Sequence, residues 1–502
     1  MAFNKKAHLL DNLKAIEIAF QLDKEGRQPT AEEREAMHRY AGFGALKCIL
    51  LPINNVNDIM SWKSSDMELL QPILKLHQVI RENTENEREY KRIINGLKNS
   101  VLTAFYTPQP VVAGIAEVLR ENGVIAQRFL DPSAGMGEFV SEFDRKGLTD
   151  QMEVVGFEKD PMTGKLLEQL YSEHDIQVNG FESIDSSYEN YFDIVSSNIP
   201  FGDVATFDPE YVRSNNPAKK QAAQTIHNYF FVKGLDCLRE GGVMAFITSQ
   251  GVLNSPSNEA IRRHLMHNSN FISAIRLPNN LFTDYAGTEV GSDLIVLQKN
   301  TKKGNALTQR DLLFIDSMKE PDGTISNKYI ELSHSAVLTQ RIQGTDPYGK
   351  PATALIHNGG IEGITKDMRD ILSSDISFYL DQKFYRSGIK WERSNKPIHS
   401  ASPVTTALTP VGESVIQEME PGKIEEISIA EEVIETKPEM TDYTTPDQKE
   451  TEEMVSEFLG RSLFDTVPVT VTNKDIPTPP TNIVEEIPKE STGIEDEAVT
   501  GT

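Results

Sequence analysis

The chain has 502 residues, and 38% of them are hydrophobic, so it is long enough for one large domain and smaller ones. No run approaches the roughly 18 consecutive apolar residues of a membrane helix, and the first residues lack the apolar core of a signal peptide. The two cysteines, Cys48 and Cys237, lack the spacing of a zinc site. These features argue against a membrane protein, a disulfide scaffold and a zinc protein, and they predict a cytoplasmic protein with no bound metal and no membrane partner.

The formal net charge is -25, which by itself argues against strong binding to phosphates. Much of this charge lies in residues 401–502, which hold roughly 23 acidic and 6 basic side chains, so the remainder carries only about -8. The predicted folded part is therefore mildly acidic. It is able to bind DNA through a local basic patch, but not as a strong nonspecific DNA binder.

Along the chain, residues 1–100 have apolar residues at helical spacing and are predicted to form a helical N-terminal region. In residues 101–300 short apolar runs alternate with helical stretches, which predicts an α/β fold with a doubly wound, Rossmann-like parallel sheet. Six runs are candidate strands. They are 128–135, 152–160, 192–202, 241–251, 271–278 and 293–300.

Two further segments are expected beyond the sheet. Residues 301–395 have weaker helix and strand patterns and are predicted to form a small appended subdomain. Residues 396–502 are acidic and poor in aromatics, so a disordered tail is predicted. Within the tail, residues 452–464 have apolar residues at helical spacing, and this segment is a candidate contact for a protein partner.

The first candidate site is the run RFLDPSAGMGEFV at 128–140, where a predicted strand ends in Asp131 and is followed by Gly135 and Gly137. Glycines at this position let the backbone pass close to a ligand at the carboxyl edge of a parallel sheet. A tight turn without a ligand would have the same pattern. Glu158 ends the next predicted strand, where a carboxylate can accept hydrogen bonds from the ribose of an adenosine. Since the turn has no basic residue for a pyrophosphate, S-adenosylmethionine fits better than a dinucleotide.

The second candidate site is FDIVSSNIPFGD at 192–203, where a buried strand leads into Asn198, Pro200 and Phe201. The amide oxygen and a backbone carbonyl are able to accept hydrogen bonds from an exocyclic amino group, and the aromatic ring is able to stack on a planar base. This set predicts an amino-bearing planar substrate.

With these motifs in this order, the sequence resembles adenine-specific (N6) DNA methyltransferases of the amino-methyltransferase superfamily. Their cofactor motif corresponds to DPSAGMGEF here and their catalytic motif to NIPF, in which Ile199 replaces a proline. Residues 1–390 also resemble the methylase portion of methylase-helicase proteins of conjugative elements and phages. The resemblance implies an enzyme that methylates adenine in DNA, with Asn198, Pro200 and Phe201 as catalytic residues.

The resemblance also implies a cofactor site and, in the late hairpin, a contact to the flipped base through Phe282. Cofactor contacts are expected from Tyr106, Thr107, Pro108, Asp131, Ser133, Ala134, Gly135, Gly137, Glu158, Phe181 and Glu182. DNA phosphates are expected to contact Arg213, Lys219 and Lys220, in the long polar segment after the catalytic motif. An ordinary solvated loop would have the same composition.

Alternatives stay open at this point. The Asn-x-Pro-aromatic geometry also suits another planar nitrogen, such as a protein glutamine or an RNA base. Another alternative is an inactive DNA-binding or scaffold protein of a mobile element, with Ile199 as a sign of decay. A nicotinamide oxidoreductase is disfavoured because the full G-x-G-x-x-G pattern is absent.

Overall fold

The computed structural model describes most of residues 4–388. The positions left out of this range are 45, 52, 54–57, 59–61, 104–105, 146–151, 203, 283–290, 322, 334–339 and 346–350. The acidic tail predicted at 396–502 lies outside the described residues, so its disorder and its partner segment stay predictions. None of the described helices is long and apolar enough to cross a membrane.

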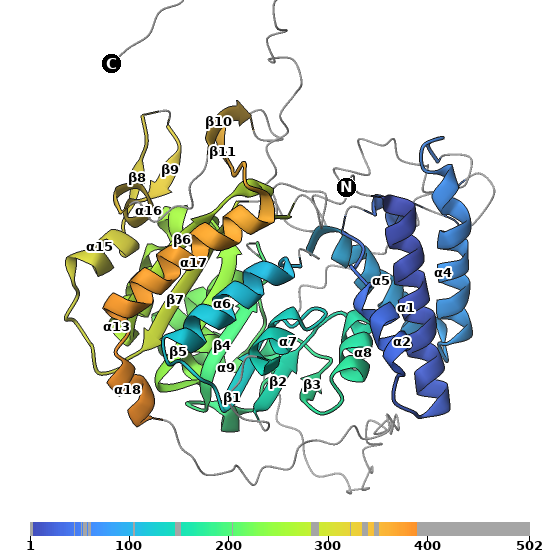
Figure 1. Cartoon of the computed structure of the whole chain (residues 1–502), viewed down its shortest axis with the longest axis horizontal. Coiled ribbons are helices and arrows are strands. Elements are labelled where there is room, and N and C mark those ends of the chain that lie inside the picture. The colour runs from blue at the N-terminus through green and yellow to red at the C-terminus, as the bar shows by residue number, and fades with distance from the viewer. Residues whose placement is uncertain are drawn as a thin grey trace, which may run out of the picture.

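The predicted helical N-terminal region is confirmed, and its helices stand together beside the main body (Figure 1). Thr30 begins the second helix with a capping box, in which Thr30 and Glu33 each bind the other's backbone N–H. The elements are α1 (Lys5–Glu25), α2 (Ala31–His38), η1 (Lys47–Leu50), η2 (Met67–Leu69), α4 (Leu70–Glu82) and α5 (Glu87–Thr103).

The main body is built on a seven-stranded sheet with the order β3-β2-β1-β4-β5-β7-β6. Its strands are β1 (Arg128–Asp131), β2 (Glu153–Phe157), β3 (Asp175–Gln177), β4 (Phe192–Asn198), β5 (Leu238–Ser249), β6 (Ser269–Leu277) and β7 (Ser292–Lys299). This confirms the predicted doubly wound class, with one departure. Strand β7 lies between β5 and β6 and runs antiparallel to both.

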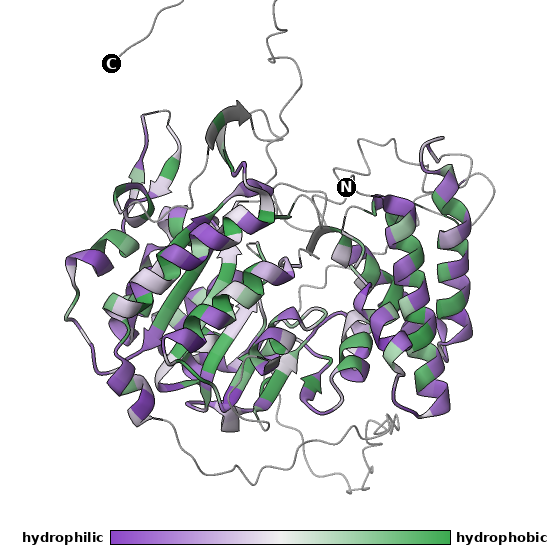
Figure 2. Cartoon of the chain, viewed as in Figure 1, coloured by the Kyte–Doolittle hydropathy of each residue, from purple (hydrophilic) through white to green (hydrophobic). Residues whose placement is uncertain are grey.

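Helices cover both faces of the sheet, and the strands between them are largely apolar (Figure 2). One face carries α6 (Gln109–Glu121), α7 (Glu138–Arg145) and α17 (Gly360–Tyr379), and the other carries α11 (Ile226–Cys237) and α13 (Glu259–Asn268). Helices α6 and α17 lie side by side (Figure 1). They approach closely at Gly114, where a Cβ would lie 3.2 Å from the side chains of Met368 and Thr365.

The predicted subdomain at 301–395 is only partly separate from this body. Helix α17 completes the helical layer, and Tyr385 Oη of α18 (Gln382–Ser387) donates a hydrogen bond to the Ile125 carbonyl, at 2.8 Å. The sequence pattern of residues 360–379 indicates a helix, but it does not show that the apolar face of this helix packs against α6. The rest of this range forms α15 (Gln309–Ile315), β8 (Ser317–Lys319), β9 (Ile325–Asn327), α16 (Lys328–Leu332), β10 (Gln340–Thr345) and β11 (Pro351–Ile356).

Shorter elements connect the strands and bring several loops to the carboxyl edge of the sheet. They are α8 (Pro161–Leu170), η3 (Phe181–Ser183), η4 (Ser186–Tyr188), α9 (Pro209–Arg213), α10 (Pro217–Ala222), α12 (Gly251–Asn254), η5 (Pro256–Asn258) and η6 (Asn279–Phe282).

Candidate active site

A cavity of about 700 Å³ lies at the carboxyl ends of β1, β2 and β4, where doubly wound sheets bind ligands. Its volume falls within the range of roughly 300–1,000 Å³ that is usual for small-molecule sites. The cavity is lined by residues of α5, residues 106–107, the turn 132–135, Glu138 and Phe139 of α7, residues 157–161 and Thr163, residues 179–182, residues 198–201 with Val204, and Ile226 and Phe230 of α11. Both candidate sites of the sequence therefore face one cavity.

Asp131, the last residue of β1, is fully buried and stabilises the turn that follows it. Its Oδ1 accepts hydrogen bonds from Ser197 Oγ, at 2.7 Å, and from Ser133 N, at 3.2 Å. Burial raises the pKa of Asp131 to about 7. Asp131 thus supports the turn but does not line the cavity, and its predicted contact with the cofactor stays a prediction.

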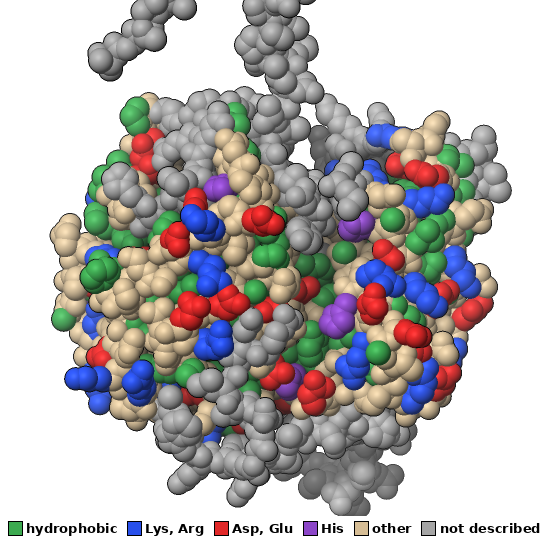
Figure 3. All heavy atoms as spheres, in the orientation of Figure 1, with side chains coloured by type: hydrophobic (Ala, Val, Ile, Leu, Met, Phe, Trp, Pro, Cys, Tyr) green, Lys and Arg blue, Asp and Glu red, His purple; other side chains and the backbone are tan. Residues whose placement is uncertain are grey.

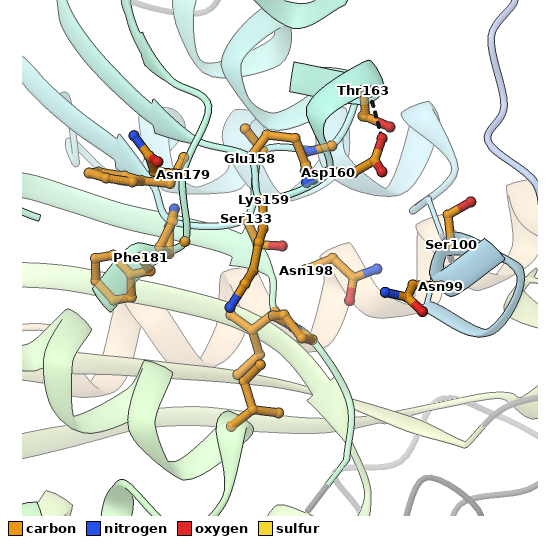
Figure 4. A pocket seen from close by; sticks show the side chains of 18 of the residues that line it. Asn99, Ser100, Ser133, Glu158, Lys159, Asp160, Thr163, Asn179, Phe181 and Asn198 are labelled. Carbon is orange, nitrogen blue, oxygen red and sulfur yellow. Dashed lines mark hydrogen bonds between the residues drawn. The ribbon is translucent and has the colours of Figure 1, made fainter. Parts of the chain in front are cut away.

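Glu158 follows β2 and faces the cavity beside the turn (Figure 4). Its Oε2 accepts a hydrogen bond from Gly135 N, at 3.0 Å, and its Oε1 accepts one from Asp160 N, at 2.7 Å. Burial, and then the neighbouring Asp160 carboxylate, raise the pKa of Glu158 to about 8. The carboxyl group is therefore fixed in place and its negative charge is poorly compensated.

Two more carboxyl groups line the same cavity, Glu138 at the start of α7 and Asp160 at the N-cap of α8. Burial raises the pKa of Glu138 to about 7 and raises the pKa of Asp160 as well. A cationic ligand would offset the free-energy cost of ionising these buried carboxyl groups, since a nearby positive charge favours ionised carboxylates. Lys159 also lines the cavity, but its Nζ pairs with Glu182 at 2.9 Å.

At one end of the cavity lie Asn179 and Phe181 (Figure 4). The Phe181 ring is buried and meets the Phe157 ring edge to face, with centroids 5.9 Å apart. Asn179, Gly180, Phe181 and Glu182 all line the cavity. This end therefore offers apolar and amide surface for a flat ring.

At the opposite end lies Asn198, the last residue of β4, followed by Pro200 and Phe201. Ile199 is buried in the hydrophobic core, and its N–H donates to the Ile247 carbonyl at 3.0 Å. A proline at this position would lack that donor. Ile199 therefore anchors the loop, and the structure gives no support for reading it as a sign of decay.

Most of the predicted cofactor residues line the cavity. They are Tyr106, Thr107, Ser133, Ala134, Gly135, Glu158, Phe181 and Glu182. Pro108, Asp131 and Gly137 lie behind the wall instead. Pro108 caps α6, and Gly137, with φ of +87°, packs so closely against Tyr171 that a Cβ would lie 2.4 Å from the ring.

Helix α5 forms a wall of the cavity that the sequence motifs did not reveal. Five of its residues line the cavity at helical spacing, and they are Arg92, Asn95, Gly96, Asn99 and Ser100. The Asn99 and Asn198 side chains point toward one another (Figure 4). The signal was present in the sequence as a helix with an apolar face and a face of Asn, Gly and Ser, but only the fold shows which surface that polar face meets.

Tyr40 of the N-terminal region lies near Tyr106. Tyr40, from the segment after α2, is buried, and burial together with Asp160 raises its pKa well above the usual value. Burial and the nearby Tyr40 likewise raise the pKa of Tyr106. Asn12 of α1 holds this segment, because its Oδ1 accepts a hydrogen bond from Ala41 N at 2.9 Å. The helical region is thus part of the site.

Two of the residues expected to contact DNA instead make contacts within the protein. The Phe282 side chain is fully buried in the hydrophobic core and is not exposed at the surface where a base would contact it. Lys219 pairs with Asp236 at 2.8 Å. Arg213 and Lys220 are exposed, on α9 and α10, the two short helices that the predicted polar loop forms. On the face shown in Figure 3, positive and negative side chains are intermixed, with no large basic patch among the described residues.

Comparison with known proteins shows that this chain is similar to DNA methylases. Residues 95–341 match the family model described as N-6 DNA Methylase. A relative in Escherichia phage P1, "Defense against restriction protein B", is 30% identical over 209 residues, which are 41% of this chain and 9% of that protein. The "Type I restriction enzyme EcoEI methylase subunit" of Escherichia coli is 24% identical over 279 residues, or 49% of this chain and 56% of that protein.

Among solved structures, the type I restriction enzyme EcoKI M protein is 14% identical, with a TM-score of 0.33, over 78% of this chain and 94% of that one. The chain spans about a tenth of the phage relative and about half of the Escherichia coli methylase subunit. The matched segment begins in α5 and includes the glycine turn, Glu158 and Asn198. Residues 95–341, just under half of the chain, therefore form a domain that matches the N-6 DNA Methylase family model.

Proposed function

We propose that this protein transfers a methyl group from S-adenosylmethionine to the N6 amino group of adenine in DNA. The observation that carries the proposal is that one cavity holds both a nucleoside-type edge, Glu158 with the turn 132–135, and an amide with an aromatic ring, Asn198 with Phe201. Direct methyl transfer to a planar amine mainly requires that the cofactor and the amino group are held in the right geometry, because positioning supplies much of the rate enhancement.

The residues present fit the cofactor. Each Glu158 oxygen accepts one backbone N–H and keeps a further lone pair for a ribose hydroxyl. Asn179 and Phe181 offer a place for the adenine ring, and the carboxyl groups of Glu138, Glu158 and Asp160 suit a ligand with positive charge. When bound, S-adenosylmethionine supplies an electrophilic methyl group on a positively charged sulfur.

The other end of the cavity fits the substrate. Asn198 Oδ1 and a backbone carbonyl of the 198–201 turn accept hydrogen bonds from the amino group, which directs the nitrogen lone pair into the cavity. Phe201 stacks on the ring of a base that has left the duplex. The buried Ile199 side chain and its hydrogen bond to Ile247 hold this turn in place.

The test is transfer of a labelled methyl group to unmethylated duplex DNA, followed by digestion to nucleosides. Label in N6-methyladenine is the expected result. Label in cytosine, in added protein or RNA instead of DNA, or no label at all would contradict the proposal. In the same assay Asn198→Ala should lose methyl transfer. Asn95→Ala removes an amide from the α5 wall of the same cavity and is the matched control, in which transfer should fall much less.

A further inference from the structure

An exposed aromatic side chain stands beside the mouth of the cavity. Phe207 has 76% of its surface exposed, whereas most phenylalanines among the described residues are buried. It lies between the catalytic turn and α9. An aromatic ring left in water forgoes the free energy that burial would provide, so this exposure calls for an explanation.

Its position follows from its neighbours. Val204 lines the cavity and is 44% exposed, so Val204 lies at the rim. Three residues span at most about 11 Å of extended chain, which keeps Phe207 near this rim. A base next to the target would pass here as the target enters the cavity.

The backbone on both sides of Phe207 is held in place. Thr206 N donates to the Ala223 carbonyl at 2.9 Å. The buried Asp208 caps α9 through Oδ1, and its Oδ2 accepts hydrogen bonds from Tyr229 Oη, at 2.7 Å, and from Lys233 Nζ, at 3.2 Å. The segment therefore presents the Phe207 ring to solvent as a fixed feature.

We propose that Phe207 stacks on a DNA base next to the target adenine and holds the strand at the mouth of the cavity. This inference rests on the proposed function. Stacking on an aromatic ring suits any base, since every base has a flat face. Exposed Arg213 and Lys220 follow on α9 and α10, where cations would meet phosphates, and this favours DNA over an apolar protein surface. The nearby acidic Glu210 is compensated by Lys219 and Lys233, each at 3.5 Å.

The test compares Phe207→Ala, Phe207→Trp and Phe378→Ala in duplex binding, methyl transfer and cofactor titration. Phe378 is a matched control, because its side chain is 80% exposed at the end of α17. The end of α17 lies near the amino end of β5, away from the carboxyl edge that holds the cavity. Asp381 N, just after α17, donates a hydrogen bond to Gln298 Oε1, and Gln298 pairs with Val243 in the first half of β5.

Phe207→Ala is expected to weaken DNA binding and raise KM for DNA by about 5- to 100-fold, the equivalent of one lost stacking contact. Phe207→Trp should retain both, and cofactor affinity should stay unchanged in all three variants. Unchanged DNA binding in Phe207→Ala, an equal loss in Phe378→Ala, or a loss of cofactor affinity would overturn the inference. A changed sedimentation coefficient with normal DNA binding would assign the ring to protein contacts and would overturn it too. If the unmodified protein methylates no DNA, the proposed function itself fails, so the two failures are distinguishable.

Discussion

The two ends of the cavity differ in how strongly the protein itself fixes them. At the Glu158 end, the carboxyl groups of Asp131, Glu158 and Asp160 accept hydrogen bonds from backbone N–H groups of the turns around them. At the Asn198 end the side chains are half-buried and lead outward to the exposed Phe207. The Glu158 end is therefore preorganised for a small ligand, while the Asn198 end is open to a large one.

The largest expected effect is at the open end. Asn198→Ala should lower the rate of methyl transfer by about 100-fold or more, because a positioned acceptor acts on the reacting group. The measurement is single-turnover transfer to DNA with saturating cofactor. Asn95→Ala should change the rate much less. Equal losses in both variants would contradict the division between the two ends.

The next effect is at the preorganised end. Gly135 has φ of +55°, and a Cβ there would lie 2.7 Å from the Tyr106 ring. Gly135→Val should therefore weaken cofactor binding by about 10-fold or more, through backbone strain and displacement of Tyr106. Calorimetric titration measures it.

Gly304→Val is the control for that strain. Gly304 has a similar φ of +57°, but a Cβ there would meet nothing within 4 Å, and it follows β7 away from the cavity. Weakened cofactor binding in Gly304→Val as well would mean that loss of stability, and not the shape of the turn, explains the result.

A smaller effect concerns pH. The pKa of Glu158 is raised from 4.5 to about 8, so its contribution to stability is fully present below about pH 4.5 and is lost as the pH rises through 8. The melting temperature of the free protein should fall between about pH 5 and 8, and less so in Glu158→Gln. Since ribose hydroxyls bind the ionised carboxylate, cofactor affinity should rise over the same window. Glu158→Gln should bind weakly at every pH, and the same pH slope in both proteins would exclude Glu158 as the titrating group.

The smallest expected effect tests the α5 wall. Replacing a glycine inside a helix by alanine ordinarily stabilises by about 1 kcal/mol. At Gly96 the added Cβ would lie only 2.2 Å from Asp160 Oδ2, so Gly96→Ala should lower the melting temperature instead. Asp160→Ser, which keeps an N-cap oxygen, should relieve that clash in the double variant. A melting temperature raised by Gly96→Ala alone would show that α5 is not pressed against α8.

The sequence patterns predicted six of the seven strands of the sheet, all except β3, and the motifs that meet at its carboxyl edge. They succeeded because Asp131, Glu158 and Asn198 each end an apolar run, and parallel strands bring such ends together. They did not predict the α5 wall or the burial of Phe282. Each of these depends on which distant surface a segment packs against, and local periodicity carries no information about that.

The most direct test of the division between the two ends is the affinity of the cofactor for Asn198→Ala, measured by calorimetry without DNA. Asn198 is proposed to act on the substrate nitrogen alone, while Glu158 and the glycine turn hold the nucleoside. The dissociation constant should therefore equal that of the unmodified protein although methyl transfer is lost. A dissociation constant raised by tenfold or more, in a variant with an unchanged melting temperature, would contradict this account.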